Sequence, residues 1–141
     1  MAVRVRLRVE RGGRVREVVA LVNSGYEADT PQLMIPARLA RELGFWPPPP
    51  DAREEFFDTA GGPIRVWVVR RAARVSVAAE DAESAPVEAD LVISHLADEP
   101  FISDVLAGKL GIAVEDFLEG LWRFRWEPKE KARKSEKPGA F

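Results

Sequence analysis

The sequence contains no cysteine and a single histidine, His95. Without cysteine, a disulfide scaffold, a thiolate nucleophile and a Cys-ligated zinc or iron–sulfur site are excluded. One histidine is too few for a His-rich metal centre, and no Gly-rich phosphate loop is present, so we expect neither a metal nor a cofactor. A Ser24–His95 hydrolase has no supporting motif, and we interpret His95 as a structural or exposed residue.

The sequence also lacks an apolar run of the roughly 20 residues that span a bilayer. Residues 1–6 alternate arginine with valine and do not form the apolar core of a signal peptide. There is no surplus of positive charge, because 21 Lys and Arg stand against 23 Asp and Glu. Counterion release therefore cannot drive binding to nucleic acid. We expect a cytoplasmic protein that binds neither a membrane nor nucleic acid.

The chain has 141 residues, of which 46% are hydrophobic, enough for one domain with a real core. We assign that domain to residues 1–126. Residues 127–141 are rich in Lys, Glu and Pro and offer little to bury. They are predicted to form a disordered charged tail.

Alternation of apolar and polar residues predicts most of the chain to be strand. Residues 2–10 alternate strictly, and Gly12-Gly13 then provides a tight turn to a return strand over 15–22. Further strands are expected over 31–35, 54–59, 63–71, 74–79, 87–94 and 121–126, with Gly61-Gly62 as a second hairpin turn. Together these segments predict a mainly β fold, a small barrel.

Two short helices interrupt the strands. The first is predicted over 37–43, with Pro36 at its first position and Gly44 beyond its end. The second is predicted over 104–109, with Ser103 or Asp104 as N-cap and Gly111 beyond its end.

The last predicted strand carries Trp122, Phe124 and Trp126 on one face, while Arg123 and Arg125 lie on the other. Base stacking would need basic neighbours beside the rings, so nucleic-acid stacking is disfavoured. We interpret the three aromatic residues as core or as a dimer seam.

Four segments in order suggest a family. An apolar strand ends in Asn23-Ser24-Gly25, where aspartic proteases carry Asp-Ser/Thr-Gly. The segment from Ile35 to Gly44 is similar to a Pro-x-x-Leu-Ala-x-x-Leu-Gly helix. Thr59-Ala60-Gly61-Gly62 resembles a flap hairpin, and Phe101-Ile102-Ser103 resembles a second apolar-apolar-Gly motif. Over about residues 15–125 the chain thus resembles the small, single-motif, retropepsin-like aspartic proteases of cellular genomes.

The resemblance implies a closed acid-protease barrel that forms a homodimer. Each chain of such a dimer contributes one loop to the twofold axis, where two carboxylates share a proton. The catalytic position falls on Asn23, Ser24 and Gly25. Groove and flap residues are Glu27, Thr59, Ala60, Gly61 and Gly62, and the second motif is Phe101, Ile102 and Ser103.

The chain departs from the family pattern at two of these positions. Asn23 is an amide and cannot act as a general base, whose loss typically costs about 10²–10⁴-fold in rate. Ser103 replaces the glycine of the second motif. Asp29 is the one carboxylate that could be recruited as the catalytic group in place of residue 23. Glu27 is interpreted as a groove or ion-pair residue, and Asp58 as an exposed turn residue.

We therefore predict a non-catalytic, aspartic-protease-like homodimer, a pseudoprotease whose groove binds an extended peptide or an unfolded protein. One alternative is an aspartic endopeptidase in which Asn23 was introduced artificially or Asp29 is recruited. Another alternative is a purely structural dimerisation module with a closed groove.

Overall fold

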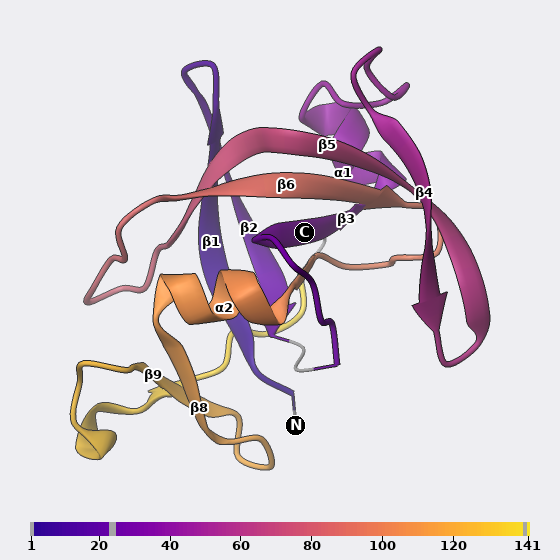
Figure 1. The fold of residues 1–141 in the computed structure, drawn as a ribbon. Coiled ribbons are helices and arrows are strands. Elements are labelled where there is room, and N and C mark those ends of the chain that lie inside the picture. The colour runs from indigo at the N-terminus through magenta and orange to yellow at the C-terminus, as the bar shows by residue number, and fades with distance from the viewer. Residues whose placement is uncertain (1, 23–24, 140) are drawn as a thin grey trace.

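A computed structural model describes residues 2–22, 25–139 and 141, and it is mainly β. The strands are β1 (Arg4–Arg11), β2 (Arg14–Val22), β3 (Gln32–Pro36), β4 (Arg53–Thr59), β5 (Gly62–Val77), β6 (Val87–Ser94), β7 (Phe101–Ile102), β8 (Ile112–Asp116), β9 (Leu121–Phe124) and β10 (Arg133–Lys134). The helices are α1 (Ala37–Glu42), α2 (Asp104–Leu110) and the 3₁₀ turn η1 (Lys129–Lys131). Figure 1 shows how these elements are arranged.

Seven strands form one sheet in the order β1-β2-β7-β3-β6-β5-β4. β1 also pairs with β5, so the pairings of β1, β2, β7, β3, β6 and β5 close into a ring. β2–β7 and β3–β6 are parallel pairs, and the other pairs are antiparallel. Within the described residues only β4 ends the sheet, because no strand pairs with its outer side. β4 and the start of β5 project from the body as a hairpin (Figure 1).

The alternating pattern of the first strand has the expected consequence. Val5, Leu7 and Val9 are buried, while the intervening arginines face outward. The β1–β2 turn places Gly12 and Gly13 at φ values of 55° and 81°, which a hairpin turn needs and glycine adopts without strain. The predicted Gly-Gly turn and its two strands are confirmed.

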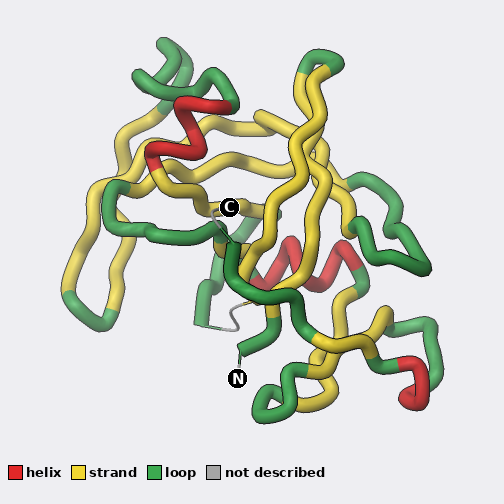
Figure 2. Tube along the Cα trace, turned by 180° about the vertical axis from the view of Figure 1, so that it is seen from behind, coloured by secondary structure: helices red, strands yellow, loops and turns green. Residues whose placement is uncertain are grey.

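The core lies inside the ring of strands and under both helices. α1 packs against β3 and β6 through Leu39, and α2 packs against β6 and β8 through Leu106 and Leu110 (Figure 2). Neither helix of the described chain combines the length and the apolar content that a bilayer crossing requires.

The ends of the helices differ slightly from the prediction. Pro36 precedes α1 as its N-cap, in an extended conformation, and is not the first helical residue. Ser103 is the N-cap of α2, and Asp104 is the first helical residue. Gly111 ends α2 in the left-handed conformation with φ 79°, as a glycine beyond a helix end should.

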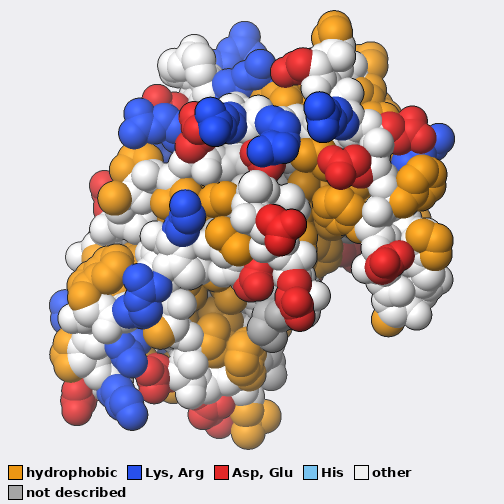
Figure 3. Space-filling model, in the orientation of Figure 1, with side chains coloured by type: hydrophobic (Ala, Val, Ile, Leu, Met, Phe, Trp, Pro, Cys, Tyr) orange, Lys and Arg blue, Asp and Glu red, His pale blue; other side chains and the backbone are white. Residues whose placement is uncertain are grey.

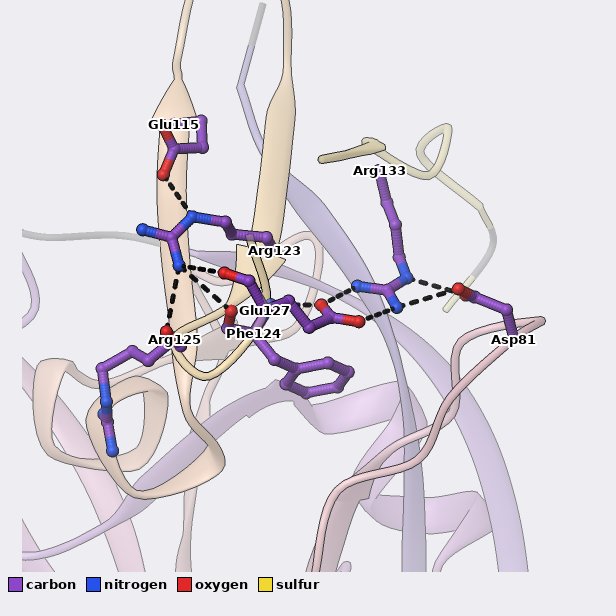
Figure 4. A network of polar contacts seen from close by, with 7 residues as sticks. All are labelled: Asp81, Glu115, Arg123, Phe124, Arg125, Glu127 and Arg133. Carbon is purple, nitrogen blue, oxygen red and sulfur yellow. Dashed lines mark hydrogen bonds and ion pairs between the residues drawn. The ribbon is translucent and has the colours of Figure 1, made fainter. Parts of the chain in front are cut away.

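Residues 127–136 pack against the domain, in the segment for which composition predicted a disordered tail. β10 pairs with β9, and the backbone N–H of Glu136 donates to Arg4 O at 2.8 Å. Arg133 forms two ion pairs (Figure 4): its Nε lies 2.7 Å from Asp81 Oδ1, and its Nη1 lies 2.5 Å from Glu127 Oε1. The composition of this segment revealed little apolar surface. Its order depends on ion pairs and strand pairing that composition does not show.

The three aromatic residues near the C-terminus do not share one environment. Trp122 and Phe124 are buried in the core as expected. Trp126 lies beyond the end of β9 and is 63% exposed, although its ring stacks on Phe124 with centroids 4.8 Å apart. The core interpretation therefore holds for Trp122 and Phe124 and does not hold for Trp126, which is exposed in the single chain.

Candidate functional site

A groove of about 860 Å³ lies between the β4–β5 hairpin, the loop of residues 25–30 and the segment that follows β6. Its floor is apolar and is formed by Met34, Phe57, Ile64 and Val68. These side chains pack with the buried residues Val66 and Val92 in a small cluster separate from the main core. Figure 3 shows the hairpin standing across a hollow from the body.

The structure brings several of the predicted site residues together in this groove. Gly25, Glu27, Thr59, Ala60 and Phe101 all line it. Two further carboxylates line it as well: Asp29, which the sequence left open as a recruited catalytic residue, and Asp58, which was interpreted as an exposed turn residue. Asn23 and Ser24 lie outside the described residues.

Other predicted residues do not line the groove. Gly61 is in the turn between β4 and β5, and Gly62 begins β5 opposite Thr59. The Thr59 hydroxyl donates to Gly62 O at 2.6 Å and accepts from the N–H of Gly61 at 3.2 Å. Ile102 and Ser103 are fully buried. These residues shape the walls of the groove without reaching into it.

The start of α2 holds the loop that forms one wall of the groove. The backbone N–H of Asp104 donates to Tyr26 O at 2.8 Å, and Asp104 Oδ1 accepts from the N–H of Ala28 at 3.0 Å. Ser103 Oγ accepts from the N–H groups of Gln32 and Leu106. The side chain of Ser103 therefore joins β3 to the helix.

A chain of side-chain hydrogen bonds runs along the same wall. Tyr26 donates its hydroxyl proton to Gln32 Oε1 at 2.8 Å. Gln32 Nε2 donates to Thr30 Oγ1 at 3.1 Å, and Thr30 Oγ1 donates to Asp90 Oδ2 at 2.8 Å. Burial first, and then the negative charge of Asp90, raise the pKa of Tyr26 well above its ordinary value. The phenol is therefore a neutral donor at physiological pH.

Asp90 is the residue at this site that sequence reasoning missed. It is only 4% exposed, and its Oδ1 accepts from the N–H of Arg71 at 2.8 Å. Arg71 has a positive φ of 47° where the register of β5 shifts against β6. Asp90 also pairs with Arg70 at 3.4 Å. The sequence did carry a signal for this residue, because Asp90 is a single carboxylate within the otherwise apolar residues 89–93.

These contacts give Asp90 a structural role. Both of its oxygens already accept hydrogen bonds from the protein. The carboxylate therefore stabilises the irregular part of β5 and the loop before β3.

His95 does not belong to a catalytic arrangement of described residues. Its ring stands edge-on to Trp46 and Trp67, with centroids 4.8 Å and 5.3 Å away. The side chain is exposed, as the sequence suggested. Across the described part of the chain, no cluster of His, Asp and Glu side chains has the arrangement to hold a metal ion.

No protein-family model matches this sequence. A comparison with curated proteins also finds no significant match. The function is therefore inferred from the geometry and chemistry of the groove.

Proposed function

We propose that the chain is a non-catalytic, retropepsin-like homodimer that binds an extended peptide. The observation that carries this proposal is the groove beside β4, which among the described strands is the one edge strand of the seven-stranded sheet. Alternate residues of an edge strand present outward N–H and C=O groups, to which an extended peptide can add as a further strand. Residues 55–59 of β4 line the groove, so the same peptide would contact its walls.

The arrangement of the elements supports a retropepsin-like barrel. The strand pairings close into a ring, the degenerate motif follows β2, and the second motif leads into α2. The β4–β5 hairpin stands over the groove where the resemblance implies a flap (Figure 3). A single motif per chain also supports a homodimer, because two loops are needed to build one such site.

The lack of catalysis follows from the side chains. Asn23 provides an amide where the reaction needs a carboxylate. Asp90 is committed to hydrogen bonds within the protein. An endopeptidase that recruits Asp29 is the second candidate, because this carboxylate lines the groove. A closed structural module is disfavoured by the open groove.

Binding and cleavage can be measured separately. Sedimentation should give a mass near twice 15.7 kDa. A fluorescent unstructured peptide should bind, and N-methylation of alternate backbone amides on the edge that would pair with β4 should weaken binding. Methylation of the other alternate amides serves as the control. Denatured casein should remain intact at acidic and neutral pH. Cleavage that depends on Asp29 would support the endopeptidase instead. A monomer in solution would exclude both the peptide-binding homodimer and the endopeptidase.

A further inference from the structure

We propose that the groove selects extended peptides that combine lysine or arginine with apolar residues. This inference rests on the proposed function, because it names the class of peptide that the same groove would bind.

Acidic side chains dominate the charge of the groove. Its described lining includes one cationic residue, Arg70, and five carboxylates, Glu27, Asp29, Glu55, Asp58 and Asp90. Arg70 is already paired with Asp90. The other four carboxylates have no described ion pair.

Many carboxylates in the rest of the described chain have an ion pair. Elsewhere, arginines pair with carboxylates, as in Arg4–Glu99, Arg16–Glu42, Arg123–Glu115 and Arg133–Glu127. The whole sequence has a net charge of only −2. The negative charge of the groove is therefore a local concentration and does not follow from the overall composition.

The four unpaired carboxylates lie on both sides of the groove. Glu55 and Asp58 belong to β4, and Glu27 and Asp29 belong to the facing loop. A peptide strand added to β4 would place its side chains beside those of β4, where opposite charges across strands stabilise pairing and like charges oppose it. Figure 3 shows acidic side chains both on the hairpin and on the body opposite it.

Apolar side chains in the same groove account for the apolar residues of the peptide. Phe56 is 67% exposed and Leu96 is 74% exposed, and both line the groove above its apolar floor. Successive side chains of a strand point to opposite faces, so Glu55 and Phe57 share one face of β4 while Phe56 and Asp58 share the other. A peptide strand beside β4 would therefore meet a carboxylate and an aromatic ring on each face, which favours a peptide that carries both basic and apolar residues. Phe56 can also contact the apolar stem of a lysine or arginine.

The test uses three fluorescent peptides of equal length that differ only at alternate positions, which carry lysine, serine or glutamate. We expect the lysine peptide to bind about tenfold more tightly than the serine peptide at low salt. We expect the glutamate peptide to bind most weakly. The preference should shrink as salt is raised to about 0.3 M, because the groove carboxylates are solvent-exposed.

Two double variants then locate the effect. Glu55→Gln/Asp58→Asn should weaken the binding of the lysine peptide about fivefold and leave the affinity for the serine peptide unchanged. Glu10→Gln/Glu80→Gln removes the same charge from exposed positions outside the groove and should change neither affinity. Circular dichroism would establish that both variants keep the fold.

The outcomes separate this inference from the function on which it rests. Equal affinity for the lysine and serine peptides would overturn the charge preference and leave peptide binding standing. Equal losses in the two double variants would also overturn it, because the attraction would then depend only on net charge. If none of the three peptides bound, the proposed function itself would fail.

Discussion

The side chain of Ser103 accepts a hydrogen bond from the backbone N–H of Gln32, with 3.0 Å between oxygen and nitrogen. Because Ser103 is fully buried and begins α2, this bond fixes the helix against the first residue of β3. The groove loop between residues 25 and 30 is held from both of these elements.

Ser103→Ala should lower the free energy of unfolding by about 1–3 kcal/mol. The change removes a helix cap and leaves a buried N–H group without its acceptor. Urea unfolding at neutral pH is the measurement. Ser103→Gly, which also removes the hydroxyl, should destabilise the protein at least as much. Unchanged stability in both variants would show that the hydroxyl is dispensable.

Arg133→Met should destabilise the protein by about 1–3 kcal/mol at neutral pH. It leaves the carboxylate of Glu127, whose side chain is only 10% exposed, without its partner. The aliphatic replacement keeps part of the packing over Trp122 and Phe124. Arg74→Met is a matched control, because Arg74 is an exposed arginine with no described ion pair.

The effect of Arg133 should depend on pH in a defined direction. Hydrogen bonds from its guanidinium group hold the pKa of Glu127 and of Asp81 below their ordinary values. The resulting stability is present above the unfolded pKa values of about 4 and is lost as the pH falls through the lowered folded values. The difference between the native protein and Arg133→Met should therefore shrink below about pH 4. A difference that grew on acidification would contradict the assignment.

Tyr26 should resist ionisation in the folded protein. It is the single tyrosine of the sequence, so the ultraviolet absorbance of its phenolate reports on this residue alone. Unfolded chain in urea should titrate near pH 10, while the folded protein should stay protonated at that pH because burial raises the pKa. The stability that Tyr26 contributes is complete below about pH 10 and is lost as the pH rises further. Coincident titration of folded and unfolded protein would show that the phenol is not buried.

Asn23→Asp should weaken the proposed dimer at neutral pH. Two carboxylates at a twofold axis repel each other unless they share a proton, which raises their pKa in the dimer. The penalty should therefore appear above the free aspartate value of about 3.9 and should be relieved below it. Sedimentation of both proteins at neutral and acidic pH measures this effect. Equal dissociation constants at neutral pH would place residue 23 away from the interface.

The same variant tests whether the amide of Asn23 is what prevents cleavage in the proposed protease-like site. Cleavage of casein by Asn23→Asp would mean that the rest of that site is complete. Without cleavage, Asn23→Asp/Ser103→Gly is the next variant. Because Ser103 caps α2 and binds β3, the stability of this double variant must be measured together with its activity.

Local features of the structure were determined by the sequence alone. The alternation of Val5, Leu7 and Val9 with arginines specifies a half-buried strand whatever it pairs with. Gly12-Gly13 specifies a tight turn, and Ser103 and Gly111 specify the two ends of a helix. Each of these depends on backbone conformation and on neighbours within a few residues, which the sequence states directly.

Only the tertiary structure decided which distant groups meet. The closure of β1 against β5 depends on a bend in β5 that the buried Asp90 stabilises from another strand. The order of the C-terminal segment depends on Arg133 reaching Asp81, a residue far away in the sequence. The acidic groove exists because β4 and the loop before β3 face each other across an apolar floor. Long-range pairings of this kind are selected by complementary charge, shape and burial in the folded chain, and no local pattern encodes them.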